Sequence, residues 1–171
     1  RGFHRGNMKE EIKVGIADYK TSESPNRITT LGLGSCVGIC LYDRYPEESG
    51  LGGMAHILLP DSRPFKKNIK VGKFADLAIP QIVEELCTGG IPIRNMVAKI
   101  AGGANMFRFS DSSPDLDIGR RNVLAVRTIL KQLGIPVLAE DTGGHLGRTM
   151  ILDLEERSVR IVTAGRQGKL L

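Results

Sequence analysis

Grouped glycines divide this chain into short segments and limit what it can fold into. The 171 residues include 21 glycines. Grouped glycines mark tight turns, where the backbone adopts positive φ or approaches another segment closely. The groups lie at residues 32–34, 50–53, 89–90, 102–103 and 143–147. Because the length suits one domain, we expect short strands joined by turns around a single structural unit.

The runs between the glycines are apolar or alternate between apolar and polar residues, which is typical of β-strands. We expect strands at residues 12–19, 28–33, 37–42, 53–59, 96–101, 136–140, 149–153 and 159–163. The run at 37–42 is apolar on both faces and therefore predicts a buried strand. Residues 44–49 are polar and contain Pro46, so we expect them to link two antiparallel strands.

Two segments have helical spacing. Residues 72–87 place apolar side chains on one face, and Pro80 inside this run is expected to kink or divide the helix. Residues 120–133 have a more regular helical pattern, with Asp117 as the predicted N-cap and Gly134 after the last turn. Their apolar stripe consists of Val123, Val126, Leu130 and Leu133. Many strands with two helices predict an α/β fold in which the helices cover one face of a largely antiparallel sheet assembly.

Composition excludes several classes of protein. Hydrophobic residues make up 41% and charged residues 25%, which is ordinary for a soluble globular domain. No apolar run approaches the ~18 residues of a membrane span, and the polar start carries no secretory signal. The net charge of +5 fits an acidic macromolecular partner, but scattered basic residues and the absence of Trp argue against nucleic acid. We expect residues 1–7 to be an expression scar and residues 8–171 to form one domain.

The three cysteines are Cys36, Cys40 and Cys87. An odd number without a secretory signal favours reduced thiols and a cytoplasmic location. Cys36 and Cys40 would lie ~13 Å apart along one strand, which is too far for a disulfide. For Cys40, inside a strand, and Cys87, inside a helix, we expect a place in the core.

Cys36 stands where chemistry is possible, directly after the glycine turn Gly32-Leu-Gly34-Ser35 and at the start of the next strand. There its sulfur would lie beside backbone N–H groups that can receive an oxyanion. If the strand containing His56 pairs with the strand after Cys36, thiol and imidazole form a nucleophile and its base. The alternative is that Cys36 is a buried core residue, as free cysteines often are.

Other candidate sites are weaker. His145 lies in a glycine-rich turn and is better explained as a loop residue than as a base or ligand. Cys36, Cys40 and His56 lack the paired spacing of a zinc site, so we expect no metal. Gly32 and Gly34 start a dinucleotide fingerprint, but Val37 replaces its third glycine and no helix follows, so we reject that site.

Several long motifs in order resemble the CheD family, the chemoreceptor glutamine deamidases of bacterial and archaeal chemotaxis. The motifs are TLGLGSCV (30–37), MAHILLPD (54–61), KIAGGANMF (99–107), IGRRN (118–122) and AEDTGG (139–144). The resemblance extends over most of the chain, from about residue 8 to residue 163. It implies a three-layer α/β/β sandwich, similar to that of toxin deamidases, and a single CheD-like deamidase domain.

The resemblance also implies a catalytic set: Cys36 as nucleophile, His56 as general base and acid, and Thr30 as the residue that orients the imidazole. The backbone near Gly34 and Ser35 would support the oxyanion, and neither a metal nor an organic cofactor is needed. Family membership would make the substrates glutamines in the cytoplasmic helices of chemoreceptors and the phosphatase CheC a partner. Two alternatives stay open: a module that modulates signalling by binding CheC, and a methylesterase that uses the same thiol and base on receptor glutamyl esters.

Overall fold

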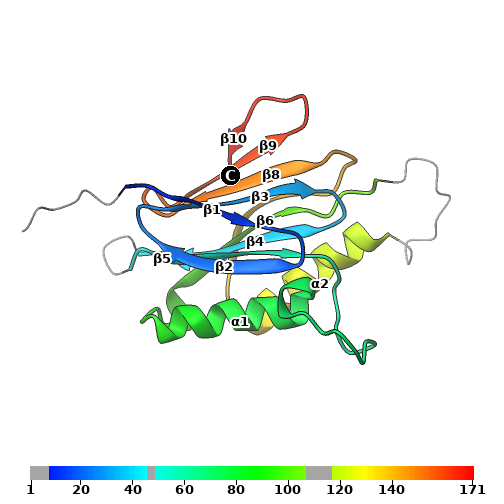
Figure 1. The fold of residues 1–171 in the computed structure, drawn as a ribbon, viewed down its shortest axis with the longest axis horizontal. Helices are drawn as coiled ribbons and strands as arrows, with labels where there is room; N and C mark the ends of the chain where they lie inside the picture. The colour runs from blue at the N-terminus through cyan, green and yellow to red at the C-terminus, as the bar shows by residue number, and fades with distance from the viewer. Residues whose placement is uncertain (1–7, 46–48, 107–116) are drawn as a thin grey trace, which may run out of the picture.

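The structure, a computed structural model, has three layers (Figure 1). Two helices form the first layer, an inner sheet packs on the helices, and an outer sheet packs on the other face of the inner sheet. It describes residues 8–45, 49–106 and 117–171. The proposed scar at 1–7 and the middle of the 44–49 link lie outside these residues. None of the helices in the described ranges is long and apolar enough to cross a membrane.

The sheet next to the helices has five strands in the order β2-β5-β4-β6-β7. They are β2 (Asp18–Glu23), β5 (Leu51–Ile57), β4 (Val37–Asp43), β6 (Met96–Gly102) and β7 (Val137–Thr142). All neighbouring pairs in this sheet are antiparallel except β6 with β7. The strand β4 therefore lies at its centre, and every one of its residues is buried.

The outer sheet also has five strands, in the order β1-β3-β8-β9-β10. They are β1 (Glu11–Val14), β3 (Arg27–Leu33), β8 (Arg148–Asp153), β9 (Ser158–Thr163) and β10 (Lys169–Leu170). Only β1 and β3 run parallel; the other pairs are antiparallel. The predicted α/β sandwich with largely antiparallel sheets is confirmed.

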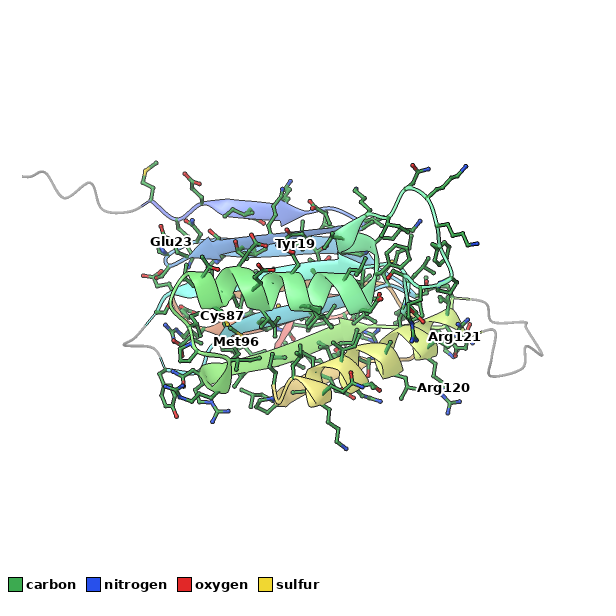
Figure 2. All side chains as sticks on the ribbon, turned by 90° about the horizontal axis from the view of Figure 1, so that it is seen from below. Tyr19, Glu23, Cys87, Met96, Arg120 and Arg121 are labelled. Atoms are coloured by element: carbon green, nitrogen blue, oxygen red, sulfur yellow. The ribbon has the colours of Figure 1, made fainter. Side chains whose placement is uncertain are left out.

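The helices are α1 (Ala75–Thr88) and α2 (Ile118–Gln132), and both lie across the inner sheet, as the view from below shows (Figure 2). Short 3-10 turns, η1 (Val71–Lys73) and η2 (Ile93–Asn95), precede α1 and β6. Pro80 does not divide α1, because one lost backbone hydrogen bond is outweighed by the buried apolar face around it. Asp117 caps α2 as predicted, accepting a hydrogen bond from the Arg120 N–H at 3.1 Å.

Two apolar cores separate the three layers. One lies between the helices and the inner sheet and contains Val37, Ile39 and Leu41 of β4. The other lies between the sheets and contains Cys36, Cys40 and Tyr42. Alternate residues of β4 thus face opposite cores, which explains its unbroken apolar run.

Two expectations about single segments are wrong. Residues 12–19 form two strands in different sheets, because the chain crosses between the sheets at Gly15–Ala17, where Ala17 has φ 62°. Cys87 is exposed, because it lies in the last turn of α1 outside the buried stripe. Cys40 is fully buried as expected, and all three cysteines are free.

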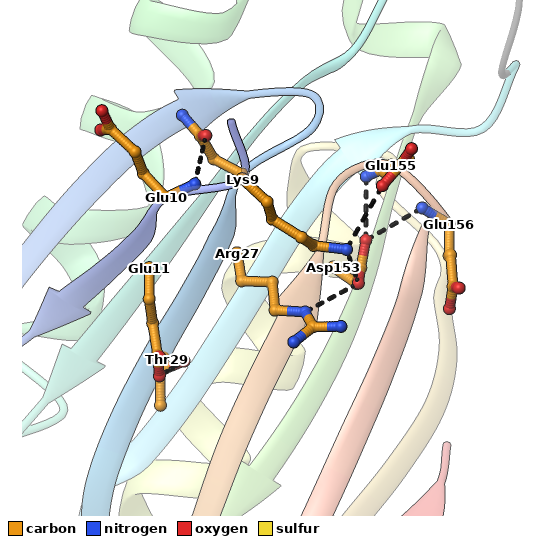
Figure 3. A network of polar contacts seen from close by, with 9 residues as sticks. Lys9, Glu10, Glu11, Arg27, Thr29, Asp153, Glu155 and Glu156 are labelled. Atoms are coloured by element: carbon orange, nitrogen blue, oxygen red, sulfur yellow. Dashed lines mark hydrogen bonds and ion pairs between the residues drawn. The ribbon is translucent and has the colours of Figure 1, made fainter. Parts of the chain in front are cut away.

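A polar network lies where β3 begins and β8 ends in the outer sheet (Figure 3). Its centre is Asp153, whose carboxylate accepts hydrogen bonds from Lys9 at 2.7 Å and Arg27 at 2.9 Å. Burial raises the pKa of Asp153, but the bonds from Lys9, the Glu156 backbone and Arg27 outweigh it and lower the pKa to about 2. This carboxylate is therefore a stabilising anion throughout the neutral range.

Candidate active site

The turn between β3 and β4 presents the Cys36 sulfur. Residues 34–36 leave the outer sheet and enter the inner one, so Cys36 stands at the boundary between the two. It is largely buried but keeps 7% of its surface exposed. The Cys36 carbonyl is held by the Gly103 N–H at 2.8 Å, and a Cβ at Gly102 would lie only 2.2 Å from that oxygen. The glycine pair at the end of β6, Gly102 and Gly103, thus permits the close approach that fixes this turn.

His56 lies on β5, the strand beside β4. The two strands are antiparallel, and His56 is directly opposite Gly38. Cys36 precedes Gly38 by two residues and therefore shares its face, so Cys36 and His56 are diagonal neighbours on the face toward the outer sheet. Such neighbours have Cα atoms about 7–8 Å apart, within reach of long side chains. The predicted pairing of the two strands is confirmed, while the Cys36 thiol forms no hydrogen bond with His56 Nε2 in the described structure.

Gly38 brings the outer sheet close to this face. A Cβ at this position would lie 2.8 Å from the Met150 sulfur and 3.0 Å from Leu33 Cδ1. Met150 is paired with Thr30 across β8 and β3. Because Gly38 has no side chain, the outer sheet lies close to the inner sheet here, and Thr30 of the outer sheet reaches His56 of the inner sheet.

Thr30 fixes the tautomer of His56. The Thr30 hydroxyl donates to the Val14 carbonyl at 2.7 Å, and its oxygen lies 2.7 Å from His56 Nδ1. Because a hydroxyl has a single proton, which goes to Val14, the second bond requires Nδ1–H to donate to Thr30. His56 Nε2 is then unprotonated, and within the described chain it is buried without a hydrogen-bond partner. The imidazole is thus held with its basic nitrogen free.

The environment keeps both groups neutral at rest. Burial lowers the pKa of His56 to about 4, because no carboxylate compensates the lost hydration of the imidazolium. Burial also raises the pKa of the Cys36 thiol, and the backbone N–H of Cys36 offsets part of this shift. Near neutral pH the two side chains are therefore a thiol and a neutral imidazole.

The backbone around the sulfur has two different roles. The Gly34 N–H donates to the Gly32 carbonyl at 3.0 Å, and the Gly34 carbonyl accepts from the Ala104 N–H at 2.8 Å, so Gly34 stabilises the turn itself. The N–H groups of Ser35 and Cys36 have no backbone acceptor among the described residues. These two donors are therefore not used by the backbone of the turn itself.

Asn122 is a site residue that the sequence analysis did not single out. It is fully buried in α2, and its side-chain amide donates to the Ser35 carbonyl at 3.0 Å and the Leu58 carbonyl at 3.1 Å. Ser35 precedes Cys36, and Leu58 follows His56 by two residues. The sequence does contain an indication of this role. Asn122 precedes Val126 by four residues and Leu130 by eight, so it places a polar side chain on the apolar face of the helix.

The remaining candidates lie apart from this constellation. His145 Nδ1 is 2.8 Å from the Asn105 carbonyl and belongs to the loop, as expected. Burial raises the pKa of Cys40 far above its ordinary value, so this thiol stays protonated. Among the described residues, no three His, Cys, Asp or Glu side chains are grouped to hold a metal ion.

Comparison with known proteins decides the family. Residues 58–163, more than half of the chain, match the family model described as CheD chemotactic sensory transduction. The chain belongs to the CheD family. A CheD relative from Clostridium kluyveri is 54% identical over 156 residues, covering 91% of this chain and 94% of the relative. A relative from Clostridium acetobutylicum is 53% identical over 161 residues, covering 94% and 95%.

A third CheD relative, from Clostridium tetani, is 53% identical over 156 residues, covering 91% of this chain and 93% of the relative. All three carry the name "Probable chemoreceptor glutamine deamidase CheD". An aligned length of 156 among 171 residues leaves too few outside it to omit Thr30, Cys36 or His56. The aligned span therefore includes these three positions.

Proposed function

We propose that this CheD chain is a chemoreceptor glutamine deamidase in which Cys36 is the nucleophile, His56 the general base and acid, and Thr30 the residue that orients His56. The observation that carries the proposal is that His56 Nε2, which has no hydrogen-bond partner among the described residues, belongs to a side chain on the same sheet face as Cys36. The names of the CheD relatives support the reaction and the receptor substrate.

The first half of the reaction forms a thioester. His56 Nε2 takes the proton of the Cys36 thiol, because the thiolate is the nucleophilic form. The sulfur attacks the carbonyl carbon of the glutamine side chain, and the oxyanion is bound by the N–H groups of Ser35 and Cys36. Each such donor is worth about 3 kcal/mol in the transition state. The imidazolium then protonates the amide nitrogen, the C–N bond breaks, and ammonia leaves.

The second half returns the enzyme to its starting state. His56 takes a proton from a water molecule, which attacks the thioester carbonyl. The C–S bond breaks, the thiolate recovers its proton from His56, and the substrate side chain leaves as glutamate. The net change is one amide plus water converted to one carboxylate plus one ammonium ion, because the carboxylic acid gives up its proton and the released ammonia takes one up in water.

Thr30→Val tests the orienting role. Valine has nearly the same shape but cannot accept the Nδ1–H bond, so the imidazole loses the contact that fixes its tautomer. We expect kcat to fall about 10- to 100-fold. Thr30→Ser keeps the hydroxyl and should retain most of kcat in the same steady-state ammonia assay. Equal losses in both variants would contradict the role.

Three features stay predictions: binding of CheC, which the family resemblance implies, a cytoplasmic location, which the cysteine pattern favours, and methylesterase activity, which is the alternative for the same site. The last is chemically reasonable, because a thiolate with a general acid also cleaves an ester. Assays with matched glutamine and glutamyl methyl ester forms of one receptor fragment separate the two activities by kcat/KM.

The proposed function is tested by intact-mass analysis of a receptor cytoplasmic fragment incubated with the protein. Conversion of an amide to an acid adds about 1 Da per site and releases one ammonia. Fragmentation of the product assigns each gain to a glutamine. A fragment whose mass is unchanged under conditions where the protein is folded would overturn the proposal.

A further inference from the structure

Most of the net charge of the chain lies in one loop. Residues 60–74, here called the basic loop, contain five cations against one carboxylate, a net of +4, while the whole chain has +5. The cations are Arg63, Lys66, Lys67, Lys70 and Lys73, and the carboxylate is Asp61. Basic residues are spread along the chain, but those outside the loop are balanced by carboxylates, so the net positive charge is local to the loop.

The basic loop adjoins the candidate active site. The Lys73 carbonyl accepts hydrogen bonds from the N–H groups of Leu58 and Leu59, directly after the strand of His56. Gly72 packs against the backbone of Asp18, next to Ala17, whose N–H donates to the His56 carbonyl at 2.9 Å. Figure 1 shows the segment between β5 and α1 looping out at the end of the molecule where both helices begin. Figure 2 places Arg120 and Arg121 at this end as well.

Internal contacts hold the loop in shape while its outer side chains stay available. The rings of Phe65 and Phe74 have centroids 5.2 Å apart, and the Lys73 ammonium lies 5.9 and 5.7 Å from them. Asp76 accepts two hydrogen bonds from Ser62. Lys66, Lys67 and Lys70 are exposed and, within the described chain, form no ion pair.

Exposed apolar side chains alternate with these cations. Phe65, Ile69 and Val71 expose 44%, 42% and 38% of their surfaces. A lysine cluster with interleaved apolar groups matches an amphipathic polypeptide with acidic side chains better than a phosphate backbone, which needs the charges alone. A groove of about 630 Å³ continues this surface and is lined by Asp61, Arg63, Arg121 and Leu124 among others.

We propose that the basic loop docks an acidic, amphipathic segment of the protein substrate and so delivers the neighbouring glutamine to Cys36. This inference rests on the proposed function. The positive potential raises the rate of encounter at low ionic strength, and the exposed apolar residues contribute contact once the segment is seated.

The test compares two triple variants with equal charge change. Lys66→Glu, Lys67→Glu and Lys70→Glu reverse the basic loop; Arg94→Glu, Lys131→Glu and Arg160→Glu reverse three exposed cations elsewhere. Deamidation of a receptor cytoplasmic fragment is followed by mass at low salt and at about 0.5 M salt, where charge interactions are screened. We expect the loop variant to lose about 10-fold or more in kcat/KM at low salt with kcat retained, and the control variant to lose little.

The outcomes separate the two proposals. If the wild-type protein does not deamidate the fragment, the proposed function fails. If it does and both triple variants behave alike, the docking surface fails and the function stands. Vesicles containing phosphatidylglycerol and a DNA duplex are tested for binding in parallel. Loss of binding to either probe in the loop variant with unchanged kcat/KM on the fragment would overturn the assignment of a protein segment.

A separate observation points to a positioning residue. Of the buried side-chain atoms without a hydrogen-bond partner in the described chain, His56 Nε2 and Asn122 Oδ1 lie at the candidate site. A buried unpaired acceptor costs stability, so its presence marks a position that serves something other than stability. The side-chain amide of Asn122 donates to the carbonyls of Ser35 and Leu58. These two residues lie just outside the paired part of β4 and β5, whose last pair is Val37 with Ile57.

We infer that Asn122 positions Cys36 relative to His56 by clamping the ends of their strands. Small displacements of reacting groups cost about 10²-fold in rate. Asn122→Ala should therefore lower kcat about 10- to 100-fold with KM changed less than about 2-fold. Leu130→Ala, a large truncation on the same buried stripe of α2, is the control for lost stability. An equal fall of kcat in both variants, or no fall in Asn122→Ala, would overturn the inference.

Discussion

Cys36→Ala is expected to abolish ammonia release from a receptor fragment while the protein stays folded. Without the sulfur there is no acyl intermediate, and the remaining groups contribute only binding and oxyanion stabilisation. Removing the nucleophile of a comparable catalytic unit costs on the order of 10⁴-fold or more in kcat. Because alanine keeps the Cβ and Cys36 lies at the margin of its core, the cost in the free energy of unfolding should be about 1 kcal/mol.

Cys40→Ala is the matched control for this experiment. Cys40 lies on β4, the strand that begins directly after Cys36, and faces the same core, but it is fully buried, and its thiol stays protonated because burial raises its pKa. It should lose stability to a similar or larger extent and keep kcat/KM within a few-fold. Intact-mass analysis measures deamidation, and thermal unfolding measures stability. Full activity of Cys36→Ala would reject the nucleophile, and loss of activity in both variants would point to packing instead of chemistry.

The sequence predicts this site as far as strand pairing determines it. The apolar runs after Cys36 and around His56 predict two strands that are neighbours in one sheet. The structure pairs these strands and places His56 opposite Gly38. The orienting role of Thr30 came from the family resemblance, because nothing in the spacing shows that a residue of the other sheet reaches the imidazole. The carbonyl of Val14, which decides the tautomer through Thr30, belongs to a third strand.

The unpredicted features depend on contacts between layers. An alternating run such as 12–19 has the same pattern whether it stays in one sheet or crosses to another at Ala17. The contacts of Asn122 join a helix to two strand ends that are 64 and 87 residues away in the chain. Local periodicity fixes which face of an element is buried, but not which polar group meets another across the core.

His56→Asn is expected to change activity and acid stability in opposite directions. Asparagine can still donate a hydrogen bond toward Thr30 but has no basic nitrogen to take the thiol proton. We expect kcat/KM to fall by about 10²- to 10⁴-fold. In the wild-type protein the pKa of His56 is about 4, because the imidazole is buried, so Nε2 remains unprotonated and the base competent well below neutral pH.

The burial of His56 also lowers the stability of the folded protein in acid. The pKa of this side chain is 6.5 when hydrated and about 4 in the folded protein. Below pH 6.5 the unfolded chain therefore binds a proton that the folded protein does not, and folding becomes less favourable as the pH falls. The loss develops between pH 6.5 and 4 and amounts to at most about 3 kcal/mol. His56→Asn removes this proton uptake, so its free energy of unfolding should vary less over that range.

Urea unfolding at pH 7.5, 6 and 5 measures this difference, and unfolding at about pH 3 adds an internal check on Asp153. The pKa of Asp153 is lowered from 3.8 to about 2, so its stabilisation is present above pH 3.8 and is lost as the pH falls toward 2. Both proteins should show that later loss, since the network around Asp153 is unchanged. Parallel stability curves of wild type and His56→Asn between pH 7.5 and 5 would contradict a buried neutral imidazole. A variant with wild-type kcat/KM would contradict its role as the base, because the Cys36 thiol would then lose its proton without Nε2.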